Sequence, residues 1–301
     1  MTPAPTAAPT LEAIARASGT FAMTAMDQRE SLVAMFDAAG RGRPGHDAIV
    51  AFKLEVARVL GPLASGFLID RDFGFDRVRD EALLPASSGL ILAADALTQD
   101  VGGPVEETEL DEVVAAPGFD LHGVAALKLL VIWRRDECRV HRHEVVERFV
   151  ALCRERGVLS VLEPVVRATP EETAAGTWDQ EEAIREAARE LSPLGQSLYK
   201  VQVPLGGRGT AEEQLAASRR LDEAITGPWV VLSQGVTPGD FSDAVLAACR
   251  AGASGFLAGR ALWSDVLGAD DVPGALRAIS APRLAALGEL VDREGRPWDQ
   301  A

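Results

Sequence analysis

The sequence predicts a single (β/α)8 barrel, and three observations favour this α/β fold class. Eight apolar runs of strand length alternate with segments whose apolar residues recur at helical spacing, as in a parallel sheet covered by helices. The 301 residues suit a barrel of about 250 residues with a few insertions. The alternative is an open doubly wound sheet. It is disfavoured because no GxGxxG follows the first strand and the glycine cluster at 206–209 lacks a GK[ST] ending.

The first half of the chain enters this alternation after a start rich in Pro, Ala and Thr. We expect residues 1–10 to form a flexible tail and residues 11–301 to form the barrel. Short apolar runs predict strands at 21–26, 66–70, 89–95 and 126–133. Helical spacing predicts helices at 11–18, 31–39, 46–60 and about 137–156. The Gly- and Glu-rich segment between the third and fourth strands should hold a small hairpin.

The second half repeats the same pattern of elements. Apolar runs predict strands at 158–166, 198–205, 229–236 and 253–260. Helices are expected at 179–191, 211–225, 241–251, 261–267 and 281–292. The segment that leads up to residue 178 has no clear period, so we expect a loop there.

The sixth strand carries a lysine in an otherwise apolar run. Side chains alternate between the faces of a strand, so Lys200 shares a face with Leu198 and Gln202. A buried lysine amine can attack a carbonyl and form a Schiff base when burial and a neighbouring cation lower its pKa. Only Lys53, Lys128 and Lys200 are lysines among 30 basic residues, and arginine forms no imine. The alternative is that these lysines reflect codon bias and chance.

A barrel places its active site at the carboxyl ends of the strands. That geometry would gather eight polar residues around one mouth: Asp27, Asp70, Asp95, Lys128, Glu163, Lys200, Ser233 and Arg260. Asp70 and Asp95 fit equally well as caps of the following turns. Glu163 lies inside an apolar strand and needs a buried partner. The lysines of the flanking strands are the nearest candidates.

The seventh and eighth strands end in Ser233-Gln234-Gly235 and Gly259-Arg260. Loops at these places in a barrel commonly bind phosphate through backbone N–H groups, and an arginine adds a fork of donors for an oxyanion. We therefore expect a phosphate or a similar tetrahedral anion there. The alternative is that the glycines serve only the geometry of the turns.

The composition excludes several classes of partner. A net charge of −15 and only 5% aromatic residues disfavour nucleic acids and anionic membranes. No HExxH or CxxC motif is present, so we expect no metal and no cofactor. Three cysteines without a pairing pattern and no signal peptide favour a cytoplasmic protein. No apolar run approaches the length of a transmembrane helix.

Six blocks of sequence, in order, together resemble one enzyme family. They are Ala25-Met26-Asp27-Gln28-Arg29-Glu30, Lys128-Leu129-Leu130-Val131-Ile132-Trp133, Glu163-Pro164-Val165-Val166-Arg167, Leu198-Tyr199-Lys200-Val201 with Pro204-Leu205, Leu232-Ser233 with Gly235-Val236, and 252–261. From about residue 11 to 292, the chain resembles the class I aldolases that include tagatose 1,6-bisphosphate aldolase. It is most similar to their sulfofructosephosphate aldolase branch.

The resemblance implies a metal-free retro-aldol cleavage of 6-deoxy-6-sulfofructose 1-phosphate to dihydroxyacetone phosphate and 3-sulfolactaldehyde, in sulfoquinovose breakdown. Lys200 would form the Schiff base and Glu163 would transfer protons. Lys128 would be the cation that activates Lys200 and orients Glu163, and Asp27 would hold a substrate hydroxyl or Lys128. The expected substrate-binding residues form two groups. Ser233, Gly259 and Arg260 match the anion pocket, and Gln28 and Lys53 are candidates for the opposite end of the substrate. Either end could take the phosphate or the sulfonate.

The resemblance leaves two alternatives and has one departure. The chain could cleave tagatose 1,6-bisphosphate or another ketose phosphate, or it could be a barrel that senses a sugar phosphate without cleaving it. The intact set of Lys200, Lys128 and Glu163 disfavours a sensor. Gln234 stands where a second small residue is expected, and the 168–178 segment is particular to this chain. The partner is thus a phosphorylated sugar, and the resemblance implies a homo-oligomer.

Overall fold

The computed structural model describes residues 9–301 and confirms the predicted barrel. Its eight parallel strands close in the order β1-β10-β9-β8-β7-β6-β3-β2. They are β1 (Phe21–Met26), β2 (Gly66–Ile69), β3 (Gly89–Ala93), β6 (Val124–Trp133), β7 (Leu159–Val166), β8 (Leu198–Val201), β9 (Trp229–Val231) and β10 (Gly255–Ala258). The expected flexible tail at 1–10 lies outside the described residues, apart from its last two positions.

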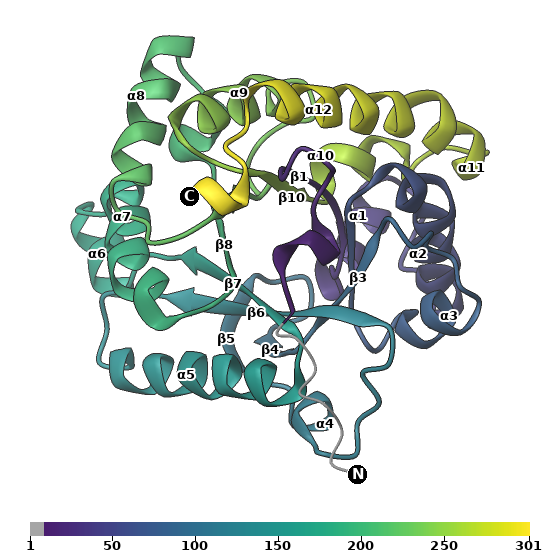
Figure 1. Ribbon diagram of the computed structural model, residues 1–301, viewed down its shortest axis with the longest axis horizontal. Helices are drawn as coiled ribbons and strands as arrows, with labels where there is room; N and C mark the ends of the chain where they lie inside the picture. Colours follow the sequence, from purple (N-terminus) through teal and green to yellow (C-terminus); the bar gives the residue numbers. More distant parts are fainter. Residues whose placement is uncertain (1–8) are drawn as a thin grey trace.

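Helices form the outer ring around these strands (Figure 1). They are α1 (Glu30–Ala38), α2 (His46–Leu60), α3 (Phe75–Asp80), α4 (Glu112–Ala115), α5 (Arg139–Arg156), α6 (Pro170–Ala175), α7 (Gln180–Leu191), α8 (Ala211–Asp222), α9 (Phe241–Ala251), α10 (Arg260–Trp263), α11 (Val272–Ala275) and α12 (Ala281–Glu294). Short 3₁₀ turns include η1 (Leu11–Ile14) and η4 (Pro204–Gly207), and a π-helical turn, η6 (Leu276–Ser280), joins α11 to α12. No helix within residues 9–301 combines the length and the apolar character needed to cross a bilayer.

The inside of the barrel has an apolar floor beneath a charged layer. Leu198, Val230 and Leu257 belong to one buried cluster of inward-facing side chains. Leu11 and Ile14 of η1 join that cluster and close the amino-terminal end of the barrel. Farther along the strands, charged side chains replace the apolar ones. The fold therefore confines its polar chemistry to the carboxyl ends of the strands.

The expected alternation along the lysine-bearing strand is confirmed. Leu198 packs in the buried cluster inside the barrel. Tyr199, Val201 and Val203 pack in a separate, outer cluster between the strands and the helices. Lys200 is 3% exposed. Its two neighbours in the sequence, Tyr199 and Val201, face the outer cluster, so the side chain of Lys200 points into the barrel. The barrel thus presents the lysine to its own interior.

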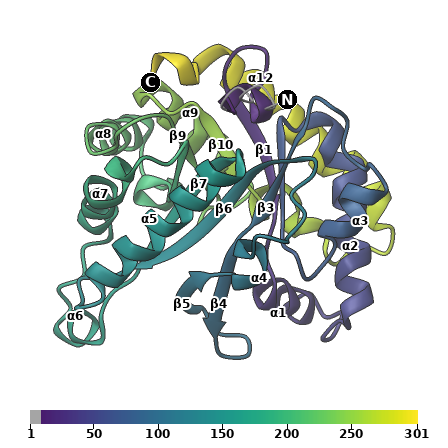
Figure 2. The same cartoon turned by 60° about the horizontal axis from the view of Figure 1, so that its bottom comes forward.

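A hairpin follows β3, as the Gly- and Glu-rich segment predicts. Strands β4 (Asp95–Gln99) and β5 (Val105–Leu110) pair antiparallel outside the barrel. Figure 2 shows the hairpin, α1 and α6 at the same end of the molecule. All three follow the carboxyl ends of barrel strands, so they lie at the end of the barrel where the site is expected.

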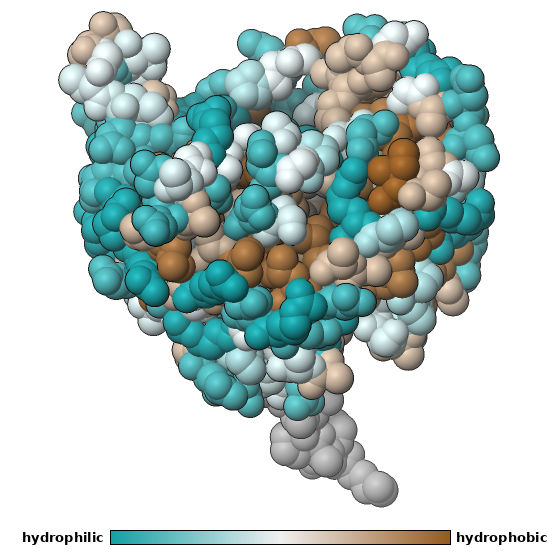
Figure 3. Space-filling view, turned by 90° about the horizontal axis from the view of Figure 1, so that it is seen from above, coloured by the Kyte–Doolittle hydropathy of each residue, from teal (hydrophilic) through white to brown (hydrophobic). Residues whose placement is uncertain are grey.

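The side drawn in Figure 3 is mostly hydrophilic, with apolar residues exposed in separate small patches. The large apolar side chains that the described residues expose most are Val101 (81%) and Val140 (70%). They lie far apart in the sequence, on the hairpin and on α5. Single exposed apolar residues of this kind are normal for a folded domain.

Several expectations about single elements are wrong. The helix expected at 11–18 is only the 3₁₀ turn η1, which ends at Ile14. The segment before residue 178 is not all loop, because α6 forms there with a capping box between Thr169 and Glu172. Pro170 begins that helix and Gly176, with a φ of 64°, ends it. Strands β8 and β9 end at Val201 and Val231, earlier than the apolar runs suggest. Beyond those ends, Val203, Leu232 and Val236 are buried in the turns that follow the strands.

Candidate active site

Lys200 lies beside Glu163 inside the barrel. Parallel pairing of Leu162 with Tyr199 places the two charged residues at the same level of β7 and β8. Lys200 Nζ is 3.0 Å from Glu163 Oε2, and both side chains are less than one-tenth exposed. The expected partnership between the buried glutamate and a flanking lysine is therefore present.

Lys128 is the centre of an ionic cluster. Its Nζ lies 2.7 Å from Asp27 Oδ2, 3.0 Å from Asp95 Oδ2 and 2.7 Å from Glu163 Oε2. Burial alone would lower the pKa of Lys128, but the three carboxylates outweigh it and raise the pKa well above its usual value. Lys128 therefore remains a cation, and Glu163 Oε2 lies between two lysine amines.

Asp27 is the first residue after β1. Burial acts to raise the pKa of its carboxyl, but Lys128 and Lys200 outweigh that effect and lower the pKa below its usual range. Asp27 Oδ2 accepts a hydrogen bond from Lys128 Nζ. The residue thus stays a carboxylate that fixes Lys128. The hydrogen bond agrees with one of the two roles that the family resemblance implies for Asp27, that of holding Lys128.

Asp95 belongs to the cluster and Asp70 does not. Asp95 accepts from Lys128 Nζ and from the backbone N–H of Leu130 at 3.1 Å, and its Oδ1 lies 3.1 Å from Arg29. Asp70 instead accepts from the backbone N–H of Phe73 at 2.9 Å, as a turn cap does. The structure therefore separates the two aspartates that the sequence leaves equivalent.

Lys53 is expected to bind the substrate, and the structure contradicts this expectation. Its side chain is fully buried and its ammonium pairs with Asp70. It does not line the mouth of the barrel. Burial lowers the pKa of Lys53 even though Asp70 acts in the opposite direction. Lys53 occupies the inner face of α2, and only the packing of that helix could show where its side chain ends.

The ends of β9 and β10 meet at Ser233. Its Oγ accepts from the backbone N–H groups of Gly259 at 3.3 Å and Ala261 at 3.4 Å. A Cβ at position 259 would lie 2.6 Å from the carbonyl oxygen of Ala25 and 2.9 Å from Nε2 of Gln28. Only glycine fits there, so the backbone at 259 packs directly against the end of β1 and against Gln28.

Arg260 follows Gly259 and lines the mouth. Burial lowers the pKa of its guanidinium, while Glu163 and Asp27 act to raise it. Within residues 9–301 no carboxylate forms an ion pair with Arg260. Its donors are therefore available to an anion, as the sequence suggests.

The mouth itself is a cavity of about 240 Å³. Its lining includes five of the expected residues: Asp27, Gln28, Lys128, Glu163 and Arg260. Lys200, Ser233 and Gly259 are buried directly behind them. Within residues 9–301 no group of three or more His, Cys, Asp or Glu side chains is arranged to hold a metal ion.

Arg29 and Arg167 also line the mouth, although neither was predicted from the sequence to have a role there. The Nε of each is buried and has no hydrogen-bond partner. Both follow the carboxyl end of a barrel strand, β1 or β7. The rule that identifies Asp27 and Arg260 from the strand ends could have identified them too.

The chain was compared with known protein families, curated proteins and solved structures. A family model described as DeoC/LacD family aldolase matches residues 21–265. Similar curated proteins include Tagatose 1,6-diphosphate aldolase of Listeria monocytogenes serotype 4b (strain CLIP80459), 27% identical over 96% of this chain and 92% of that protein. Tagatose 1,6-diphosphate aldolase 2 of Streptococcus pyogenes serotype M3 (strain MGAS315) is 26% identical over 94% of both chains.

A solved structure supports the fold. Fructose-bisphosphate aldolase from Plasmodium falciparum, in a complex with TRAP and a small-molecule inhibitor, superposes with a TM-score of 0.69. The match covers 96% of this chain and 98% of that chain at 15% identity. At this level of identity the likeness concerns the barrel alone.

Proposed function

This chain belongs to the DeoC/LacD family of aldolases, and on that premise we propose that it cleaves a ketose 1-phosphate through a Schiff base on Lys200. The observation that carries this proposal is the position of Glu163 Oε2, 2.7 Å from Lys128 Nζ and 3.0 Å from Lys200 Nζ. A nucleophilic amine with a proton acceptor in reach is the arrangement that covalent catalysis requires.

The first half of the reaction forms the imine. Lys200 Nζ adds to the C2 carbonyl of the ketose, and the resulting carbinolamine loses water. Glu163 accepts a proton from the attacking amine and donates one to the departing hydroxyl. The ion pair with Lys128 keeps the carboxylate of Glu163 within reach of the amine of Lys200. The product of this half is an iminium ion on Lys200.

The second half breaks the bond between C3 and C4. A base removes the proton of the C4 hydroxyl, the C4 aldehyde departs, and the electron pair of the broken bond moves into the iminium to give an enamine. Glu163 is the carboxylate within reach of Lys200. Protonation of the enamine at C3 and hydrolysis of the imine then release dihydroxyacetone phosphate and restore the free amine of Lys200.

The phosphate of the ketose would lie against Arg260, beside Ser233 and Gly259. A guanidinium without a carboxylate partner supports this assignment, since arginine binds a phosphate through two parallel hydrogen bonds. Gln28 lines the same mouth and would hold a substrate hydroxyl. Asp27 would fix Lys128, as its hydrogen bond does in the free protein.

For the substrate we propose 6-deoxy-6-sulfofructose 1-phosphate, which would yield dihydroxyacetone phosphate and 3-sulfolactaldehyde. The six matching blocks of sequence support this choice, and the donor-rich residues around the mouth suit a second anion. The second candidate is tagatose 1,6-bisphosphate, because the curated relatives carry that name at 26–27% identity. We also propose a metal-independent reaction, since the iminium supplies the electron sink, and a cytoplasmic homo-oligomer.

Borohydride trapping tests the mechanism. Dihydroxyacetone phosphate and borohydride should leave a reduced adduct on the peptide that contains Lys200, read by mass spectrometry, and Lys200→Met should abolish it. Lys53→Met should retain the adduct as the control, because that lysine lies outside the mouth. Absence of the adduct, together with cleavage that EDTA abolishes, would refute the Schiff-base mechanism.

Cleavage rates test the substrate. The ratio of kcat/KM for 6-deoxy-6-sulfofructose 1-phosphate to that for tagatose 1,6-bisphosphate should exceed one. A ratio below one favours the second candidate. If the protein binds these sugars but cleaves neither, and Lys200→Met leaves the binding unchanged, the chain is a sensor and the proposal is wrong.

A further inference from the structure

A second cavity adjoins the mouth of the barrel. It has a volume of about 790 Å³ and lies beyond the ends of β7 and β8. Arg167 and Gln234 line both this cavity and the mouth. The mouth, at about 240 Å³, is smaller than the roughly 300–1,000 Å³ of most small-molecule sites. A six-carbon substrate attached to Lys200 therefore needs space beyond the mouth.

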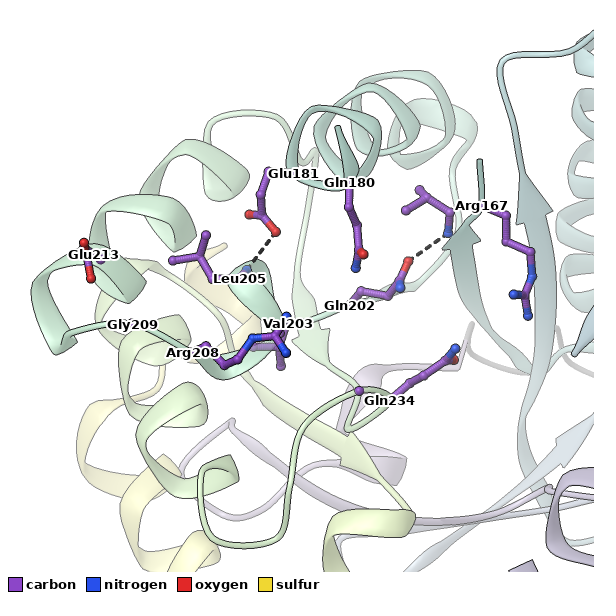
Figure 4. Close-up of a pocket in the computed structure, with 13 residues that line it drawn as sticks. Arg167, Gln180, Glu181, Gln202, Val203, Leu205, Arg208, Gly209, Glu213 and Gln234 are labelled. Carbon is purple, nitrogen blue, oxygen red and sulfur yellow. Dashed lines mark hydrogen bonds between the residues drawn. The ribbon is translucent and has the colours of Figure 1, made fainter. Parts of the chain in front are cut away.

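Hydrogen-bond donors converge in the second cavity. Figure 4 shows the amides of Gln180, Gln202 and Gln234 ending around one hollow, between the guanidinium groups of Arg208 and Arg167. The Oε1 of Gln202 accepts from the backbone N–H of Val166 at 2.8 Å. This bond fixes the amide and leaves its NH₂ group to donate into the cavity. Gln202 is only 7% exposed, so the donor is held in place.

The acidic residues in the lining are already engaged. Glu181 Oε1 accepts from the backbone N–H of Leu205 at 2.7 Å, and Glu213 Oε2 accepts from that of Thr210 at 2.8 Å. Within residues 9–301 neither Arg167 nor Arg208 forms an ion pair with a carboxylate, and Arg167 Nε is buried without a partner. The cavity thus offers hydrogen-bond donors and two guanidinium groups without a carboxylate partner, which suit an oxyanion.

We propose that this cavity binds the terminal oxyanion of the substrate, at the end remote from Arg260. This inference rests on the proposed function and adds the position of the second anion. With its phosphate at Arg260 and its C2 on Lys200, the substrate passes Glu163 and enters the cavity between Arg167 and Gln234. The oxyanion is a sulfonate or a phosphate, held by Arg208, Arg167 and the three amides.

Two substrates that differ only at the terminal group test the inference: 6-deoxy-6-sulfofructose 1-phosphate and 6-deoxyfructose 1-phosphate. Arg208→Gln should lower the ratio of their kcat/KM values at least about 10-fold, the effect of losing one charge-assisted hydrogen bond. The change should come mainly from KM of the sulfonate substrate. Gln234→Leu should act in the same direction. Repeating the comparison with fructose 1,6-bisphosphate in place of the sulfonate substrate separates sulfonate from phosphate.

Arg148→Gln is the matched control, because Arg148 lies on the outer surface of α5 and pairs with Glu112. It should keep the ratio within about twofold of the parent. If Arg208→Gln and Gln234→Leu also keep the ratio for every terminal group while dihydroxyacetone phosphate still traps on Lys200, the inference is wrong and the proposed function stands. If the parent forms no adduct and cleaves no ketose 1-phosphate, both are wrong.

Discussion

At the scale of single residues, the site depends on the balance of charge around Lys128. Asp27, Asp95 and Glu163 surround this ammonium, and Lys200 and Arg29 add positive charge at the edges of the group. Each member is buried or nearly so, and its charge is compensated only by its neighbours. Removal of one partner from such a group leaves a buried charge unpaired, which costs about 3–5 kcal/mol.

Glu163→Gln should therefore affect both activity and stability. Loss of the proton-transfer group should lower kcat by about 10²–10⁴-fold. The free energy of unfolding should fall by about 3 kcal/mol or more, because the amide leaves Lys128 and Lys200 facing each other without a carboxylate between them. Steady-state kinetics and urea unfolding measure the two effects. The exposed Glu137→Gln is the control, and a variant at 163 with the parent's kcat would contradict the assigned role.

At the scale of elements, the last long helix is tied to the start of the barrel by one carboxylate. Asp292 of α12 accepts hydrogen bonds from Arg16, Ser18 and Thr20, including 2.8 Å from Arg16 Nε and 2.5 Å from Ser18 Oγ. The Arg16 guanidinium is the main cause that lowers the pKa of Asp292 to about 2. The contact thus holds α12 to the segment between η1 and β1.

A pH titration of stability checks this contact. Because the pKa of Asp292 is lower in the folded protein, its contribution is present above the unfolded value of about 4 and is lost as the pH falls toward 2. Asp292→Asn should lower the stability at pH 7 by about 0.5–1 kcal/mol, since the pair is partly exposed and screened. The difference from the parent should shrink below pH 4.

Thermal unfolding at pH 3 and pH 7 measures this difference. Asp270→Asn is the control, because that carboxylate is 98% exposed in its pair with Arg41. Its effect should be small at both values of pH. An Asp292→Asn effect that stays constant between pH 7 and pH 3 would contradict the assignment.

At the scale of the whole molecule, the fold depends on the seam where the last strand meets the first. Phe21 of β1 pairs with Gly255 of β10, and this parallel pairing closes the barrel. Gly255 has a φ of 137°, and a Cβ there would lie 2.0 Å from the carbonyl oxygen of Phe21. Both the backbone conformation and the space require glycine.

Gly255→Ala should thus impair closure of the barrel. We expect a loss of about 3 kcal/mol or more in the free energy of unfolding, since backbone strain alone costs about 1–3 kcal/mol and the clash adds to it. Circular dichroism with urea measures the loss. Gly268→Ala is the control because no atom lies within 4 Å of its Cβ position. Equal stabilities of the two variants would show that the seam tolerates a side chain.

The fold class, the lysine-bearing strand and the direction of Lys200 could all be predicted from the sequence. These follow from local patterns, because alternation within a strand and the order of strands and helices depend on neighbouring residues. The strand ends likewise placed Asp27, Lys128, Glu163 and Arg260 at one mouth. The short helix α6 was not predicted from the sequence, because six residues are too few to show a helical period.

Which charged side chains meet could not be predicted and became known from the packed structure. It brought Asp95 to Lys128 and left Asp70 as a turn cap, although both follow apolar strands in the sequence. It buried Lys53 against Asp70, away from the mouth, and it placed Arg167 and Gln234 between two cavities. The physical reason is that strand pairing and helix packing set the distance and direction between side chains far apart in the chain, and no local pattern contains that information.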